Sequence, residues 1–353
     1  MHRLSSPLRA SACTSAPVKN PAWKRWLSAV LIPAALSACT KTDEPVAVVP
    51  LDRGGAPPLL AVNVGERPYP LLFDTGATSI IVDPRTAAQH LKQLSDAEIA
   101  AWERYGEPLA RTTTLLGGKE AVLQYYRAPS SRYGRWALPF TEVIQATRVP
   151  ALDALSRKAG ERVDGVLGMK QISTLNWMWD PTAGRLTGYR FASKAFAAQR
   201  DQMTCTAIRL QSDGTPTIAI LLDGWTMWFT LDTGFVGDAS GSLSIADVAP
   251  LRHVNALSGE VTVHRAKSAD GKAGESVTVV QVKTAQLENL QLDGLVFHQI
   301  ALSPARLGVS FINRFKRVAF DFETNRFCFV PPKQSMPDKL PTKAELAEYT
   351  VDN

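Results

Sequence analysis

The sequence predicts a mostly β protein made of two similar halves with a few short helices. Two strand-forming runs end in the same tripeptide, Asp-Thr-Gly, at 74–76 and again at 232–234. Before each tripeptide lies a strand, a short turn and a second strand, and the two layouts align without a gap. With 353 residues, 45% of them hydrophobic, the chain is long enough to bury the core of two β lobes.

Residues 1–38 have the features of an export signal. Lys24-Arg25 precedes an apolar run over 26–38, which is too short to span a bilayer as a stable helix. The run ends in Leu36-Ser37-Ala38-Cys39, which resembles the lipobox of bacterial lipoproteins. This resemblance implies cleavage before Cys39, a lipid on its sulfur and, since Thr40 follows, anchoring in the outer membrane facing the periplasm. The alternative is an ordinary secretory signal with a chance cysteine.

The net charge of +6 does not indicate a nucleic-acid partner. The chain has 39 Lys and Arg against 33 Asp and Glu, and five of the basic residues precede Cys39 with no acidic residue among them. The remainder therefore carries 39 − 5 = 34 basic side chains against 33 acidic ones. The excess charge belongs to the export signal, so no nucleic acid is expected.

Composition divides the rest of the chain into four parts. Residues 39–58 are polar, contain Pro and Gly and lack periodicity, which predicts a tether. A first lobe is expected over 59–200 and a second over 201–331, followed by a polar, Pro-rich tail over 332–353.

Three helices are predicted from their first residues. Asp83 with Pro84 starts one helix, Ser95 with Glu98 starts a second, and Ser244 starts a short helix in the second half. We expect all three to serve packing.

Two hairpins with glycine-containing tips are predicted, one in each half. The first turns at Gly117-Gly118 and the second at Asp270-Gly271. Such hairpins can exclude water and hold an extended peptide by its backbone, so these four residues are candidate substrate contacts. Ordinary surface hairpins are the equal alternative.

Cys205 and Cys328 are the two cysteines that follow Cys39. In an oxidising compartment an even pair predicts a disulfide, with two buried free thiols as the alternative. The histidines are scattered without the spacing of metal ligands, so neither a metal nor a cofactor is expected.

The repeated tripeptide supplies two acids, Asp74 and Asp232, which lie 232 − 74 = 158 positions apart. Two carboxylates a few ångströms apart share one proton, because both cannot ionise cheaply. The ionised acid can take a proton from water while the protonated one polarises a carbonyl. One copy of the tripeptide would indicate only a solvated turn, but two copies behind matching strands predict a catalytic dyad.

The other residues of the tripeptides suit the same arrangement. Gly76 and Gly234 permit two loops to approach closely, because glycine has no side chain. Thr75 and Thr233 offer hydroxyls that can cross-link the loops beneath the carboxyls.

Over 59–331 these features resemble the aspartic peptidases of the pepsin and retropepsin superfamily, and the end of the second half is most similar to the bacterial retropepsin-like branch. The matching segments are 73–77, 231–234, 164–168 and Leu307-Gly308. The resemblance implies two β-barrel lobes, a cleft between them and Asp74 and Asp232 as catalytic residues, with Thr75 and Thr233 interlocked below. It implies an aspartic endopeptidase. We expect a monomer whose partners are an extended polypeptide substrate and, through the lipid, a membrane.

Two departures from that pattern stand out. Pepsin-like enzymes place a hydroxyl residue after Asp-Thr-Gly, where this chain has Ala77 and Phe235, so a less acidic pH optimum is expected. Arg306 replaces an apolar residue two positions before Gly308. A peptide-binding lipoprotein that does not cleave, or a structural envelope protein, are therefore the alternatives to an enzyme.

Overall fold

The fold is mostly β, as the strand patterns predict. The computed structural model describes residues 43–51, 57–105, 108–114, 120–264, 276–301, 304–332 and 339–343, all within the compact unit Lys41–Asn353. The predicted export signal with Cys39, the tips Gly117-Gly118 and Asp270-Gly271, and most of the tail lie outside the described residues.

The first half contributes a nine-stranded sheet. Its strands, in spatial order, are β10 (Trp136–Leu138), β9 (Ser131–Tyr133), β2 (Leu59–Val64), β3 (Arg67–Phe73), β12 (Gly165–Leu167), β4 (Ile81–Val82), β11 (Val143–Ala146), β8 (Gln124–Arg127) and β5 (Lys92–Gln93). The hairpin β6 (Thr112–Thr114) and β7 (Glu120–Val122) forms a separate two-stranded sheet.

The second half contributes a ten-stranded sheet. Its main order is β20 (Leu257–His264), β21 (Ser276–Val282), β24 (Val296–Ile300), β19 (Gly241–Ser244), β25 (Arg306–Leu307), β18 (Trp225–Leu231), β17 (Pro216–Leu222), β22 (Ala285–Leu287) and β23 (Leu290–Gln291), with β16 (Arg209–Leu210) also paired to β17.

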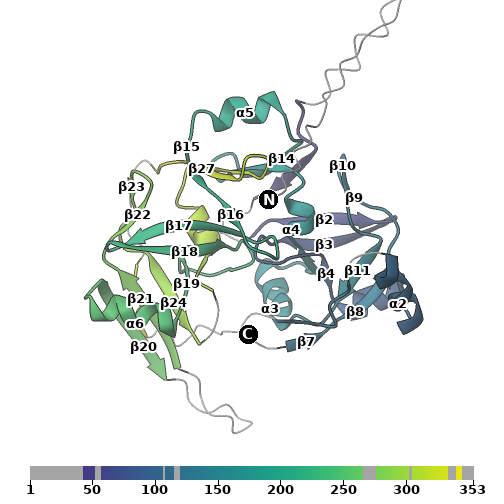
Figure 1. Cartoon of the computed structure of the whole chain (residues 1–353), viewed down its shortest axis with the longest axis horizontal. Coiled ribbons are helices and arrows are strands. Elements are labelled where there is room, and N and C mark those ends of the chain that lie inside the picture. Colours follow the sequence, from purple (N-terminus) through teal and green to yellow (C-terminus); the bar gives the residue numbers. More distant parts are fainter. Residues whose placement is uncertain are drawn as a thin grey trace, which may run out of the picture. The chain divides into compact units, whose positions relative to one another are not determined.

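A six-stranded sheet draws on both halves. Its order is β1 (Ala47–Pro50), β14 (Arg185–Tyr189), β13 (Asn176–Asp180), β26 (Arg317–Asp321), β27 (Arg326–Val330) and β15 (Thr204–Ala207). Strands β13 and β26 pair where the halves meet, with Met178 opposite Ala319. Helix α5 (Lys194–Arg200) covers one face of this sheet (Figure 1). The buried ring of Phe196 on this helix packs against Met178 and Ala319 of the sheet.

The repeat expected from the sequence is present in the strand pairing. β2 pairs antiparallel with β3, and β17 with β18. β12 then runs parallel to β3, as β25 runs parallel to β18. The two Asp-Thr-Gly segments therefore leave equivalent strands of two separate sheets.

The helices are short and mostly begin at the predicted residues. The Asp83 side chain accepts from the Arg85 N–H at the start of α1 (Pro84–His90), and Ser95 and Glu98 cap each other before α2 (Asp96–Tyr105). Ser244 forms a capping box with Asp247 at α6 (Ile245–His253). The remaining helices are α3 (Pro150–Ala159), α4 (Met169–Ile172) and α7 (Val309–Ile312).

Two expectations need correction. Neither large sheet closes into a barrel among the described strands, because the end strands of each order do not pair with each other. Residues 47–50 of the predicted tether form strand β1, since Ala47 and Val49 are buried while the backbone pairs with β14. Pairing with a strand that is distant in the sequence makes this segment a β-strand, although its own sequence has no clear strand periodicity.

Candidate active site

The two Asp-Thr-Gly loops are tied to each other through their threonines. The N–H of Thr75 donates to the Thr233 hydroxyl and the N–H of Thr233 donates to the Thr75 hydroxyl, both at 3.0 Å. Each hydroxyl donates in turn to a backbone carbonyl of the opposite strand, Thr75 to Leu231 and Thr233 to Phe73, both at 2.6 Å. Both threonines are completely buried. The bonds fix one loop against the other.

Each aspartate lies against the glycine of the opposite loop. A methyl group built on Gly76 would come within 2.4 Å of the Asp232 carboxyl carbon, and one on Gly234 within 2.5 Å of the Asp74 carboxyl carbon. Any side chain at either position would displace a carboxyl group. Glycine is therefore needed here for close approach, and the two acids meet between the loops.

Within each loop the backbone holds the carboxylate in the same way. Oδ1 of Asp74 accepts from the N–H groups of Gly76 and Ala77 at 2.8 and 3.1 Å. Oδ1 of Asp232 accepts from Gly234 and Phe235 at 3.0 and 3.1 Å. In both loops two N–H groups donate to one carboxyl oxygen, so the backbone alone holds the two acids in nearly the same way.

Arg306 breaks this equivalence. Its Nη1 donates to Oδ2 of Asp232 at 2.7 Å, and the Asp232 side chain is only 4% exposed. A guanidinium in contact with a buried carboxylate compensates its negative charge. The Asp232 side therefore carries a positive charge in direct contact with the carboxyl.

The pKa of Asp74 is raised from 3.8 to about 8. Burial is the largest cause, and the negative charge of Asp232 and a hydrogen bond with its side chain act in the same direction. The N–H of Gly76 and the charge of Arg306 oppose the rise. Near neutral pH, Asp74 thus holds a proton beside Asp232, which is the arrangement needed for paired acid and base chemistry.

Strands β12 and β25 support the loops at equivalent points. The N–H of Asp74 donates to the Leu167 carbonyl at 3.0 Å, and that of Asp232 to the Leu307 carbonyl at 2.9 Å. Gly168 and Gly308 follow these leucines and begin α4 and α7. The duplicated chain therefore sets the backbone of both aspartates by the same contacts.

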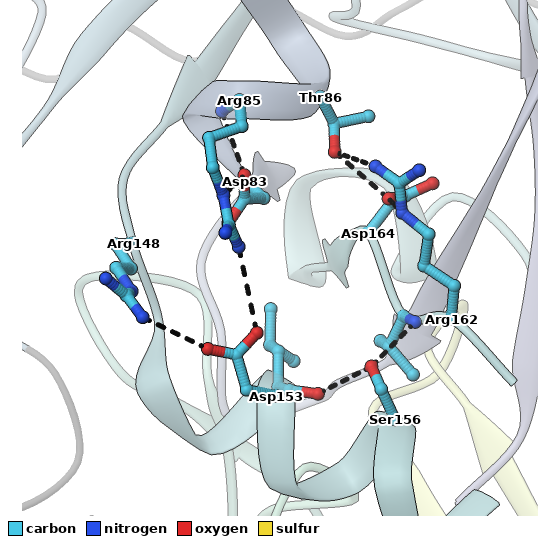
Figure 2. Close-up of polar contacts among 10 residues, drawn as sticks. Asp83, Arg85, Thr86, Arg148, Asp153, Ser156, Arg162 and Asp164 are labelled. Carbon is cyan, nitrogen blue, oxygen red and sulfur yellow. Dashed lines mark hydrogen bonds and ion pairs between the residues drawn. The ribbon is translucent and has the colours of Figure 1, made fainter. Parts of the chain in front are cut away.

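A polar cluster lies behind the support strand of the first half (Figure 2). Asp164, the residue before β12, is buried and contacts Arg162 and the hydroxyl of Thr86 on α1. Nearby, Asp153 on α3 pairs with the exposed Arg85 and Arg148. These contacts link α1 and α3 to the start of β12, so the cluster braces the backbone, and none of them involves Asp74 or Asp232.

Cys205 and Cys328 are joined by a disulfide between neighbouring strands β15 and β27, where they are direct register partners.

Asp180 and Asp321 each accept a backbone N–H three residues on, and each pairs with an arginine, Arg317 or Arg200. Asp180 and Asp321 therefore stabilise the turns at the ends of their strands and are not part of the Asp74–Asp232 pair. Among the described residues no group of three or more His, Cys, Asp or Glu could hold a metal ion.

Of the described helices, none combines the length and apolar character needed to span a bilayer.

Sequence reasoning did not find the contact of Arg306 with Asp232. The available signal was a charged residue at a position where the first half has the buried Val166. A basic side chain in a strand that otherwise supports an acidic loop is a reason to look for an ion pair.

Comparison with known proteins adds little to this geometry. Neither a protein-family model nor a curated protein matches the chain. One solved structure that it resembles is a retropepsin-like aspartic protease from Rickettsia conorii, at 18% identity over 36% of this chain and 92% of that chain, with a TM-score of 0.28. A likeness at this TM-score carries no argument about function.

Proposed function

We propose that the protein is an aspartic endopeptidase that hydrolyses peptide bonds with a water molecule activated between Asp74 and Asp232. The observation that carries the proposal is the contact of each carboxyl with the glycine of the opposite loop, in loops cross-linked by Thr75 and Thr233. The proton held by Asp74 near neutral pH supports the same conclusion.

The reaction follows from the state with one proton on the pair. Asp232 as a carboxylate takes a proton from water while the water oxygen bonds to the peptide carbonyl carbon. Asp74 gives its proton to the carbonyl oxygen, which yields a tetrahedral diol. Asp232 then passes its proton to the amide nitrogen while Asp74 takes a proton back from a hydroxyl of the diol. The carbon–nitrogen bond breaks, an acid and an amine are released, and the pair again holds one proton on Asp74. No covalent link to the protein forms.

The substrate class is proposed to be extended segments of envelope or periplasmic polypeptides. The proposal includes two lobes, one in each half of the chain, with a cleft between them. It also includes glycine-tipped hairpins that extend β6 with β7 and β20 with β21. A lipid on Cys39 is proposed to hold the protein at the outer membrane. These elements rest on the sequence patterns given above.

The proposal is tested with a peptide library and four proteins. Wild type is expected to yield cut products, and Asp74→Asn and Asp232→Asn each to lose about 10³-fold or more in kcat/KM, because one proton-transfer group is removed. Asp213→Asn, at an exposed turn where the side chain accepts the Thr215 N–H, is the matched control and is expected to cleave normally. Cleavage by both dyad variants at the wild-type rate would refute the proposal.

A second candidate is a lipoprotein that binds peptides without cutting them. The ion pair of Arg306 with Asp232 favours it, because it occupies an oxygen that a catalytic water would otherwise approach. Binding of library peptides by wild type without any cut product would select this candidate.

A further inference from the structure

We propose that Arg306 is a positioning residue that decides which carboxyl of the dyad carries the proton: it holds Asp232 as the base and leaves the proton on Asp74. This inference rests on the proposed function and adds to it the range of pH over which the pair is ready to act. The dyad then has fixed acid and base roles.

The two carboxyls accept matching hydrogen bonds from the backbone but not from side chains. The backbone gives each Oδ1 two N–H donors at 2.8 to 3.1 Å, so it cannot distinguish the acids. Arg306 adds a donor at 2.7 Å to Oδ2 of Asp232. Both Asp232 oxygens accept hydrogen bonds, one of them charge-assisted, and a protonated carboxyl would give up part of that set.

Arg306 lies on the support strand of the second half. Arg306 pairs with Thr230 in the parallel ladder of β25 and β18, the place that Val166 occupies opposite Leu72 in the first half. Val166 and Leu72 are covered by Leu152 of α3 in an apolar cluster. The segment before β25 has no described helix of this kind, and the Arg306 side chain is 22% exposed while it contacts Asp232. The second half thus has room for a cation where the first half has packing.

Other charged and titratable groups lie around the pair. The charges that act on Asp74 come from Asp232, which raises its pKa, and from Arg306, which lowers it. On β24 the ring of His298 meets the ring of Phe235 edge to face at 6.3 Å. Burial lowers the pKa of His298 while Asp238 opposes this, so His298 adds positive charge only under acidic conditions.

The pair therefore holds one proton over a wide range of pH. Asp74 keeps its proton up to about pH 8. At the acidic end, Arg306 resists uptake of a second proton by the dyad, because that proton would cancel the charge it contacts. The protein is therefore ready to act at the near-neutral pH expected outside the cytoplasm.

The pH profile of kcat/KM tests the assignment. Arg306→Met is expected to move the acidic limb upward by about 1 pH unit or more, the effect of an arginine beside a carboxylate, which is a loss of about tenfold at a fixed pH on that limb. Arg306→Lys keeps the charge, so its acidic limb is expected to lie close to the wild-type position. Arg317→Met removes an Arg–Asp pair, with Asp180, away from the dyad and is expected to leave the limb in place.

A uniform loss at all pH values in Arg306→Met, with an unmoved acidic limb, would show a purely structural role and overturn the inference. If wild type cuts no peptide, the proposed function fails while the inference is still decided by the ¹³C carboxyl signals of labelled aspartates, assigned through Asp74→Asn and Asp232→Asn. Uptake of the second proton at a higher pH in Arg306→Met than in wild type supports it. Equal titration in the two proteins refutes it.

Discussion

The first and second Asp-Thr-Gly loops have the same backbone but different surroundings. Each aspartate accepts two N–H groups of its own loop, donates its N–H to a leucine carbonyl and meets the opposite glycine. Behind the first loop lie an apolar cluster and α3, whereas Arg306 contacts the second aspartate. Duplication therefore fixes the backbone of both acids in the same way, whereas the equivalent positions Val166 and Arg306 give the two carboxyls different surroundings.

The largest expected effect is on stability at different pH values, and it tests the acid role of Asp74. Its pKa of about 8 in the folded protein lies above the ordinary 3.8, so the unfolded chain releases this proton first. The stabilising contribution is complete below about pH 4 and declines as pH rises towards 8, by up to about 1.4 kcal/mol per pH unit. Asp74→Asn removes this decline. Urea unfolding should show Asp74→Asn gaining up to about 4 kcal/mol over wild type between pH 4.5 and 7.5.

A gap between the two proteins that stays constant with pH would mean that Asp74 is ionised in the folded state. Both loops would then carry an ionised aspartate, and the proton on Asp74 would no longer distinguish the first loop from the second.

Thr75→Val and Thr233→Val test the part that the loops share. Each change removes a hydroxyl that donates to a carbonyl and accepts an N–H across the loops, leaving both partners buried. We expect each to lower the free energy of unfolding by about 3 kcal/mol, with the two values within about 1 kcal/mol of each other. Thr226→Val, on the exposed face of β18, is the control. Strongly unequal losses would show that the cross-link is not symmetric.

Gly76→Ala and Gly234→Ala test the close approach of the acids. The added methyl would meet the opposite carboxyl at 2.4 to 2.5 Å, so the carboxyls must move apart. We expect kcat/KM to fall about 10²-fold or more while circular dichroism stays unchanged. Full activity in both variants would mean that the contact between the loops is not needed for cleavage.

The smallest effect is expected for Arg148→Met, in the polar cluster of Figure 2. Arg148 is 67% exposed and pairs with the half-exposed Asp153, so its loss should cost about 0–1 kcal/mol. The pH–activity profile should not move, in contrast to Arg306→Met. A moved acidic limb would show that the first loop also depends on a nearby arginine.

The sequence predicts those parts of the molecule whose structure is set by local residues or by the repeat. Turn residues predict the hairpins before Asp74 and Asp232, and a capping residue predicts the start of α1. The duplicated order of the chain predicts the strands that precede Gly168 and Gly308. Strand β1 could not be predicted, because its order comes from pairing with β14 more than a hundred residues later. The direction of the Arg306 side chain likewise depends on neighbours that only the folded chain brings together.

The acid and base roles of the two loops depend on Asp74 and Asp232 lying in contact and holding one proton between them. A neutron structure of deuterium-exchanged protein crystallised near neutral pH would locate that proton directly. We expect carboxyl oxygens about 2.5–3.0 Å apart with a single deuteron on Asp74. Carboxyls separated by more than about 4 Å, or a pair carrying no deuteron, would contradict this expectation.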